Sequence, residues 1–379
     1  MPQLSTPARA ILAIVMLLAA TPAAPAADIR LGWLATGSGD EGLDGLKLAV
    51  ADDNASGRFL GQAYTLEPVI LPPGGDAVAG LKQLADKAIR FVVADLPAAD
   101  LIRAADAAAA TGLVLIDAGA ADDSLREGEC RRNLLHTRPS RAMLADGLAQ
   151  VLVRKSWKSW LLVVGPEPAD RLYAAAIRRA AAKFGARIVA ERPWTYTRDA
   201  QRTAEGESVA LTQGVSYDVV VVADEAGAFG DSMVFNTWEP RPVAGTQGLT
   251  ASAWSPVHDQ WGATQVQNRF RAQAGRAMTE RDFAAWAAGR AVGEAAMRGR
   301  TSDPARIEAA MRGSDFTLAV FKGRAASFRP WDGQLRQPIL VGWARAVVAV
   351  APQEGFLHPF TDLDTLGSDQ GEKKCAARQ

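Results

Sequence analysis

Short apolar runs that predict β-strands alternate along this chain with segments of helical periodicity. In the first series we expect strands at residues 29–35, 64–71, 91–94 and 113–117, separated by helices at 41–54, 76–88 and 98–110. Parallel sheets that are covered by helices on both faces produce this pattern, because their strands are buried on both sides and their connections are helical. The first part of the chain is therefore predicted to be a doubly wound α/β unit.

The same pattern restarts after Pro139. Its expected elements are helices at 143–154 and 170–184 and strands at 160–164, 187–190 and 218–223. A strand-like GLTASAW segment, a long helical region from about 263 to 298, a short helix at 305–311 and a hairpin-like pair around Asp332-Gly333 complete the pattern. We therefore predict an α/β fold with two doubly wound parallel-sheet lobes.

The charge balance excludes several classes of protein. The chain has 379 residues, with 42 Lys and Arg against 42 Asp and Glu, and 48% of its residues are hydrophobic. A nucleic-acid-binding protein needs an excess of basic residues to replace phosphate counterions, and a disordered chain has fewer apolar residues. We expect no nucleic-acid partner, and the length is typical of two domains.

The N-terminus has the order of features that a signal peptidase requires. Arg9 precedes an apolar run at residues 10–20, and small residues follow at Ala24 and Ala26. We predict that residues 1–26 are a secretory signal peptide and that the mature protein is exported. Cys130 and Cys375, the only two cysteines, would then lie in an oxidising compartment, either bridged to each other or as two free thiols.

Two short motifs are similar to enzyme signatures but lack residues that the chemistry needs. The GxGxxG motif at 37–42 follows a predicted strand, yet Asp40 and Glu41 would repel the pyrophosphate of a dinucleotide at the helix N-terminus. Gly230-Asp231-Ser232 resembles the nucleophile block of some lipases and esterases, but no histidine lies in a pattern that pairs it with Ser232. We expect no cofactor and no catalysis; a hydrolase that uses Ser232 is the enzymatic alternative.

An acidic segment near the C-terminus begins like a calcium-binding loop. Asp362, Asp364 and Asp369 are its candidate ligands, but Leu366 occupies the fifth, ligand-bearing position and Lys373 the twelfth. We interpret the segment as a solvated tail, and a site for a hard cation is the alternative.

Two tryptophans lie where open α/β sheets bind ligands. Trp33 and Trp254 are at the ends of predicted strands, and such sheets bind ligands outside the carboxyl ends of their strands. Both residues are therefore candidate ligand contacts.

The order of these segments resembles the type I periplasmic solute-binding proteins of ABC transporters, in particular the branched-chain amino-acid receptors. The resemblance is carried by IRLGWLATGSGDEGLDGLKLAVADDNASG, RPSRAMLADGLAQVL, WLLVVGPEPADRLYAAAIRRAAAKFGARIV, DFAAWAAGRAVGEAA and FRPWDGQLRQPILVGWA. It implies a monomeric periplasmic receptor that closes two hinged lobes on one small solute and then docks on an ABC permease in the inner membrane. It also implies a first lobe at 28–140 plus 257–325, a second lobe at 141–256 plus 326–352, and a tail at 353–379.

The positions that bind the ligand in that family hold different residues here. Asp95 lies in the loop after the third strand, where the family has a hydroxyl-bearing residue, and the fourth strand ends in Asp117-Ala118-Gly119. In the second lobe, Glu225 follows Asp224 at the position that the family gives to an aromatic residue. These carboxylates would repel the carboxylate of an amino acid, so we expect a cation, a polyol, an alcohol or a metal chelate as the ligand.

The C-terminal segment FLHPFTDLDTLG, with Cys375 beyond it, is similar to a subgroup of binding proteins encoded beside pyrroloquinoline-quinone (PQQ)-dependent alcohol dehydrogenase systems. This similarity implies a receptor that serves alcohol oxidation, whose solute is an alcohol-related compound, the quinone or a metal. A periplasmic ligand sensor and a metal or metal-chelate receptor on the same fold are the alternatives.

Overall fold

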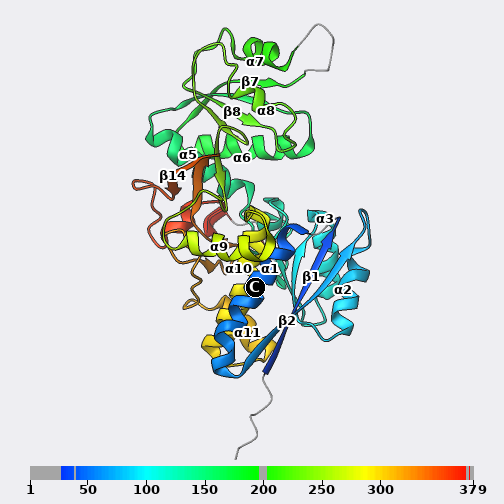
Figure 1. The fold of residues 1–379 in the computed structure, drawn as a ribbon. Helices are drawn as coiled ribbons and strands as arrows, with labels where there is room; N and C mark the ends of the chain where they lie inside the picture. The colour runs from blue at the N-terminus through cyan, green and yellow to red at the C-terminus, as the bar shows by residue number, and fades with distance from the viewer. Residues whose placement is uncertain (1–26, 38–39, 196–202, 373–374, 376–379) are drawn as a thin grey trace, which may run out of the picture.

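The computed structural model describes residues 27–37, 40–195, 203–372 and 375. The predicted signal peptide lies outside these residues. Figure 1 shows two lobes, a lower one that contains β1 and β2 and an upper one that contains β7 and β8. Within the described ranges, no helix is both long enough and apolar enough to cross a membrane.

The first lobe is built on a parallel five-stranded sheet in the order β2-β1-β3-β4-β5. Its strands are β1 (Ala27–Thr36), β2 (Gln62–Leu71), β3 (Phe91–Asp95), β4 (Val114–Asp117) and β5 (Leu134–His136). One face packs against α1 (Asp40–Gly57), α9 (Ala263–Ala274), α10 (Glu280–Gly299) and α11 (Pro304–Arg312), and the other packs against α2 (Ala77–Asp86) and α3 (Ala98–Ala108). Helices therefore bury both faces of this sheet.

Helices α1 and α10 lie close together because small residues form their contact. A Cβ atom at Gly45 would collide with the backbone of Asp282, and a Cβ atom at Gly289 would lie 2.6 Å from that of Ala49. The Asp282 carboxylate also accepts a hydrogen bond from the amide of Gly42 at 2.9 Å. These contacts hold α10 on the first lobe, although it follows the second lobe in sequence.

The second lobe is built on a seven-stranded sheet in the order β14-β13-β10-β9-β8-β6-β7. Its strands are β6 (Ser159–Val164), β7 (Arg187–Pro193), β8 (Val219–Ala223), β9 (Val243–Gly245), β10 (Leu249–Ser252), β13 (Ile339–Trp343) and β14 (Ala346–Ala351). Strands β6 to β10 are parallel, whereas β13 and β14 form an antiparallel hairpin beside β10. Helices α5 (Arg141–Arg154) and α6 (Pro168–Phe184) cover one face, and α7 (Ala204–Thr212) and α8 (Gly230–Met233) cover the other. The predicted fold class is confirmed.

The chain passes between the lobes after β5, after β10 and before β13. A short antiparallel pair, β11 (Ser327–Phe328) and β12 (Leu335–Arg336), precedes the last passage and turns near Asp332-Gly333. This pair lies beside β5, where the amide of His136 donates to the carbonyl of Gly333 at 2.9 Å. The lobe boundaries given above stay a prediction.

The long helical region expected from about 263 to 298 is wrong as a single element. Gly275 ends α9 in the left-handed region, with φ at 70°, and the Thr279 hydroxyl caps α10 by accepting a hydrogen bond from the amide of Asp282. The chain therefore turns between two separate helices. Strands β5 and β9 and helix α7 are further elements that the sequence pattern did not indicate.

The C-terminal tail returns from the second lobe to the first. It leaves β14, contains the short 3-10 helices η2 (Asp362–Thr365) and η3 (Gln370–Glu372), and reaches the loop before β5, near α4 (Ser124–Glu127). There Cys375 is bridged to Cys130, with 5.7 Å between their Cα atoms. The structure thus contains the bridged alternative for the two cysteines.

Candidate functional site

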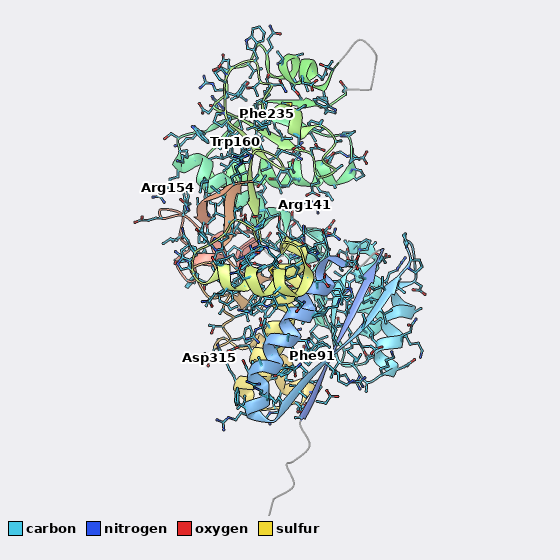
Figure 2. The ribbon with its side chains drawn as sticks, viewed as in Figure 1. Phe91, Arg141, Arg154, Trp160, Phe235 and Asp315 are labelled. Atoms are coloured by element: carbon cyan, nitrogen blue, oxygen red, sulfur yellow. A yellow bond between two sulfur atoms is a disulfide. The ribbon has the colours of Figure 1, made fainter. Side chains whose placement is uncertain are left out.

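A cavity of about 710 Å³ lies between the two lobes. Its first-lobe wall is formed by the carboxyl ends of β1, β3 and β4 and by the beginnings of α3 and α10. Its second-lobe wall is formed by the segments that follow β8 and β9 and by part of α6. Figure 2 shows Arg141, which lines this cavity, at the level where the lobes meet. Ligands of open α/β sheets bind at this edge, so the cavity is the candidate site.

Asp95 ends β3 and lines the first-lobe wall. Its carboxylate forms an ion pair with Arg281 of α10 at 3.1 Å. Burial raises the pKa of Asp95, and the positive charges of Arg281 and Arg138 oppose this shift. Gly119 lies beside it in the wall, and a Cβ atom at Gly119 would collide with the Asp95 carboxylate. Glycine is therefore required here for the two loops to approach each other.

Asp117 ends β4, but its side chain belongs to the interior. The carboxylate is fully buried and lies 2.8 Å from Nδ1 of His136 and 3.3 Å from Nη2 of Arg126. Burial on its own would raise the pKa of Asp117, but the hydrogen bond with His136 and the charge of Arg126 outweigh it and lower the pKa. Asp117 also accepts hydrogen bonds from the amides of Gly119 and Ala120, so it shapes the wall without lining the cavity.

Asp224 directly follows the buried strand β8 and organises the loop there. Its carboxylate accepts hydrogen bonds of 2.7 to 2.9 Å from the backbone amides of Ala228, Phe229 and Gly230. Three amide donors satisfy the charge inside the protein, although the residue borders the cavity. Asp224 is therefore a structural carboxylate.

Glu225 lines the second-lobe wall and pairs with Arg141 through two hydrogen bonds of 2.7 and 2.8 Å. Arg141 also lies 3.3 Å from Asp122 of the first lobe. Burial disfavours its charge, but the hydrogen bonds to Glu225 and the charges of Glu225 and Asp122 hold the pKa of Arg141 above its usual value. This group links the two walls.

Three of the predicted ligand contacts lie in the core of the first lobe. Trp33 is unexposed and packs where a Cβ atom at Gly42 would meet its ring, and Ala118 is 1% exposed. The ring of Trp254 stacks on that of Phe283, with 4.5 Å between their centroids. None of the three lines the cavity between the lobes, although Trp254 borders a smaller hollow of about 220 Å³. Trp33 lies within β1, whereas Ala118 and Trp254 follow the ends of β4 and β10. All three side chains belong to the core on the face of the sheet that α1 and α10 cover.

Several residues that line the cavity were missed by the sequence analysis. They are Arg138 on the crossing after β5, Tyr173 on α6, Thr246 and Gln247 after β9, and Glu280 and Arg281 at the start of α10. The sequence analysis took Pro139 as the change of lobe. Its neighbour Arg138 could have been placed at the cleft from that signal. The residues after β9 could not be placed because that strand was not predicted.

The hydroxyl of Ser232 has no histidine partner among the described residues. It donates to the carbonyl of Phe229 at 2.8 Å and lies 2.9 Å from the hydroxyl of Ser208. The chain's three histidines are held elsewhere, at Asp117, at the carbonyl of Phe321 and at Asp369. Among the described residues, no histidine is therefore placed to activate Ser232.

The acidic tail is paired with basic side chains. Asp362 pairs with Arg324, Asp364 pairs with both Arg329 and Arg336, and Asp369 lies 3.2 Å from His358. Among the described residues, no group of His, Cys, Asp and Glu side chains converges to hold a metal ion. The tail is therefore ion-paired with the protein, and its interpretation as a solvated segment is wrong.

The fold and the cleft define a two-lobed binding protein. The sequence matches the family model described as periplasmic binding protein over residues 29–345, and the chain belongs to this family, which consists of binding proteins and not of enzymes. Comparison with curated proteins gives no match.

Solved structures with a similar fold cover most of the chain. One is a branched chain amino acid ABC transporter periplasmic ligand-binding protein from Burkholderia xenovorans, with 16% identity, a TM-score of 0.74, and coverage of 93% of this chain and 100% of that one. Another is a leucine-, isoleucine-, valine-, threonine-, and alanine-binding protein from Brucella ovis, with 13% identity, a TM-score of 0.68, and coverage of 83% and 89%. A third is an ABC transporter solute binding protein from R. palustris in complex with benzoate, with 12% identity, a TM-score of 0.65, and coverage of 92% and 99%. At these identities the similarity establishes the fold.

Proposed function

We propose that this protein is the solute receptor of an ABC importer, which binds one small solute between its lobes and delivers it to a permease. The observation that carries the proposal is the cavity of about 710 Å³, whose walls come from both lobes. Because three chain segments connect the lobes, a solute that contacts both walls stabilises a closed form. The permease then distinguishes the closed receptor from the open one.

The group formed by Arg141, Glu225 and Asp122 supports this closing motion. Arg141 begins the first helix of the second lobe and pairs with carboxylates from both sides of the cleft, at 2.7 Å to Glu225 and 3.3 Å to Asp122. Of these two pairs only the one with Asp122 joins the lobes, so this pair forms when the lobes approach and breaks when they separate. The receptor is proposed to act as a periplasmic monomer.

We also propose that the imported solute serves PQQ-dependent alcohol oxidation. The support is the similarity of the tail segment FLHPFTDLDTLG to the receptors encoded beside those systems. Deleting the gene should then impair growth on a primary alcohol as the carbon source and leave growth on succinate unchanged. Equal growth of the deletion strain on both substrates would contradict this link.

The receptor function is tested by purifying the protein from periplasm and examining it by native mass spectrometry and small-angle X-ray scattering. We expect a retained small molecule of defined mass, whose removal increases the radius of gyration and whose return restores it. If candidate solutes change neither the radius of gyration nor the melting temperature, the proposed receptor function is wrong.

A further inference from the structure

The acidic side chains of the cleft are already compensated by the protein. Asp95 pairs with Arg281, while Asp122 and Glu225 share Arg141. Asp224 accepts three backbone amides, and Glu280 accepts the amide of Ala253 at 2.8 Å. The carboxylates that led us to expect a cationic or neutral ligand are therefore bound to groups of the protein itself.

Arg138 is different from every other charged residue of this wall. In the part of the chain that the structure describes, its guanidinium has no ion-pair partner, and its Nε atom is buried without a hydrogen-bond acceptor. Its backbone is fixed, because the carbonyl accepts hydrogen bonds from Arg126 at 2.9 Å and from Gln334 at 3.1 Å. A buried donor that lacks an acceptor costs stability, so the position favours a bound acceptor.

Arg138 lies near a carboxylate that already has a cationic partner. Arg138 and Arg281 both act on Asp95, so two guanidinium groups face one carboxylate. Helix α3 begins on the same wall without a side-chain cap, and the positive end of its dipole adds to the field. Arg141 of the second lobe stands against Glu225 of its own lobe and Asp122 of the first lobe, so these two carboxylates share another guanidinium. Because Asp95 is already paired with Arg281, the guanidinium of Arg138 has no carboxylate of its own among the described residues of the cavity.

We infer that Arg138 binds a carboxylate of the solute, and that the ligand class is small organic carboxylates. This inference rests on the proposed receptor function. The planar guanidinium offers parallel N–H donors that match the two oxygens of a carboxylate. Across the cavity, Tyr173 of the second lobe presents a phenol with no hydrogen bond to the described residues. Burial and the charges of Glu225 and Glu280 raise the pKa of Tyr173, so its hydroxyl keeps its proton and can donate a hydrogen bond. A carboxylate with a polar group at its far end would contact both lobes.

The test compares carboxylates with their neutral amides. The probes are acetate, glycolate, benzoate and PQQ, and the amides acetamide, glycolamide and benzamide, titrated by calorimetry and by thermal shift. We expect at least one carboxylate to bind saturably and its amide to bind far more weakly. R138Q should weaken binding of that carboxylate by about 10- to 100-fold, as expected for the loss of a charge-assisted pair. R138K should recover part of the affinity, because it keeps the charge without the planar fork.

R306Q is the matched control, because it makes the same chemical change at an exposed position of α11. It should bind like the wild type. Native mass spectrometry of R138Q from periplasm gives a second readout, since a retained anionic solute should be lost from this variant.

Two results separate this inference from the proposed function. A retained solute that is neutral or cationic, or equal affinity of R138Q and wild type for the bound carboxylate, overturns the role of Arg138 and leaves the receptor function intact. If wild type retains no solute and none of the probes alters its melting temperature or radius of gyration, both are wrong.

Discussion

At the scale of single residues, two buried aspartates have opposite pKa shifts although each one contacts an arginine. Asp117 is compensated by His136 and Arg126, and its pKa is lowered. Asp53 of α1 is also buried and contacts Arg290, but here burial dominates and raises the pKa to about 7. Gly293 makes room for this carboxyl, because a Cβ atom there would collide with it. The two aspartates therefore respond to pH in opposite directions.

Replacing Asp53 with Asn should flatten part of the pH dependence of stability. In the folded chain Asp53 keeps its proton up to about pH 7, whereas its ordinary pKa is 3.8. The folded state therefore binds more protons between these values, and the contribution of Asp53 to stability falls as pH rises through this window. The free energy of unfolding of D53N, relative to that of wild type, should rise by about 1 to 3 kcal/mol as the pH increases from 4.5 to 7.5. Urea unfolding at a series of pH values measures this difference. A constant difference between the two proteins across this range would contradict the raised pKa.

The residues of the site show what the sequence could predict and what it could not. The positions at the ends of β3, β4 and β8 could be predicted because strand ends define them. Of the residues predicted there, Asp95, Gly119, Asp224 and Glu225 line the cavity. Their pairing was not predictable, because Arg281 approaches Asp95 from a helix that lies 186 positions away in the sequence. The acidic sequence therefore pointed to a cationic or neutral ligand, whereas Arg138 has no ion-pair partner among the residues of the cleft that the structure describes.

At the scale of elements, one buried lysine connects the three segments that cross between the lobes. Nζ of Lys322 donates to the carbonyl of Ala253, after β10, at 2.9 Å and to Oε1 of Gln337, before β13, at 2.7 Å. Gln337 in turn donates to the carbonyl of Thr137, after β5, at 2.7 Å. Burial lowers the pKa of Lys322 well below its ordinary range, and its Nζ lies 4.7 Å from the centroid of the Phe283 ring. This network fixes the crossing segments relative to one another.

Replacing Lys322 with Met should loosen the hinge. The carbonyl of Ala253 and the amide oxygen of Gln337 would be left without their donor, at a cost of about 2 to 4 kcal/mol. Hydrogen exchange should accelerate in the crossing segments at 137–140 and 253–256 more than in the strands of either lobe. K155M, at an exposed lysine after α5, is the control and should change stability by less than about 0.5 kcal/mol. Unchanged exchange in the crossing segments of K322M would show that the network does not stiffen them.

Strands and helices with a strong local pattern were predicted to within a few residues, as β1, β3 and α3 illustrate. Strands β5 and β9 have three residues each, which is too short for an alternating pattern to be recognised. The break between α9 and α10 was missed because apolar residues continue on both sides of Gly275, although Gly275 and the Thr279–Asp282 capping pair are helix stop and start signals. The lengths of elements thus limit what periodicity detects.

At the scale of the whole molecule, the C-terminal tail forms a strap across both lobes. On the second lobe, Asp146 accepts the amide of Gly367 at 2.8 Å, and Arg179 and Lys183 donate to the carbonyl of Gly367 at 2.8 and 3.0 Å. On the first lobe, Ser368 donates to Glu127 at 2.9 Å. In Figure 1 the red end of the chain lies where the lobes meet. The strap is therefore an additional connection between the lobes besides the crossing segments.

The disulfide fixes the end of this strap to the first lobe, so its removal should widen the range of the hinge. In the C130S/C375S variant, the end of the tail is no longer covalently held, while Asp146, Arg179 and Lys183 still hold its middle on the second lobe. We expect the ligand-free variant to have a larger radius of gyration than the ligand-free wild type, and the ligand-bound variant to have an unchanged one. The variant should also lose about 2 to 5 kcal/mol of stability, because a long loop is no longer closed. Scattering with and without the retained solute, together with thermal unfolding, measures the two effects separately. A lower melting temperature with an unchanged ligand-free radius of gyration would show that the bridge stabilises the first lobe without limiting its movement against the second.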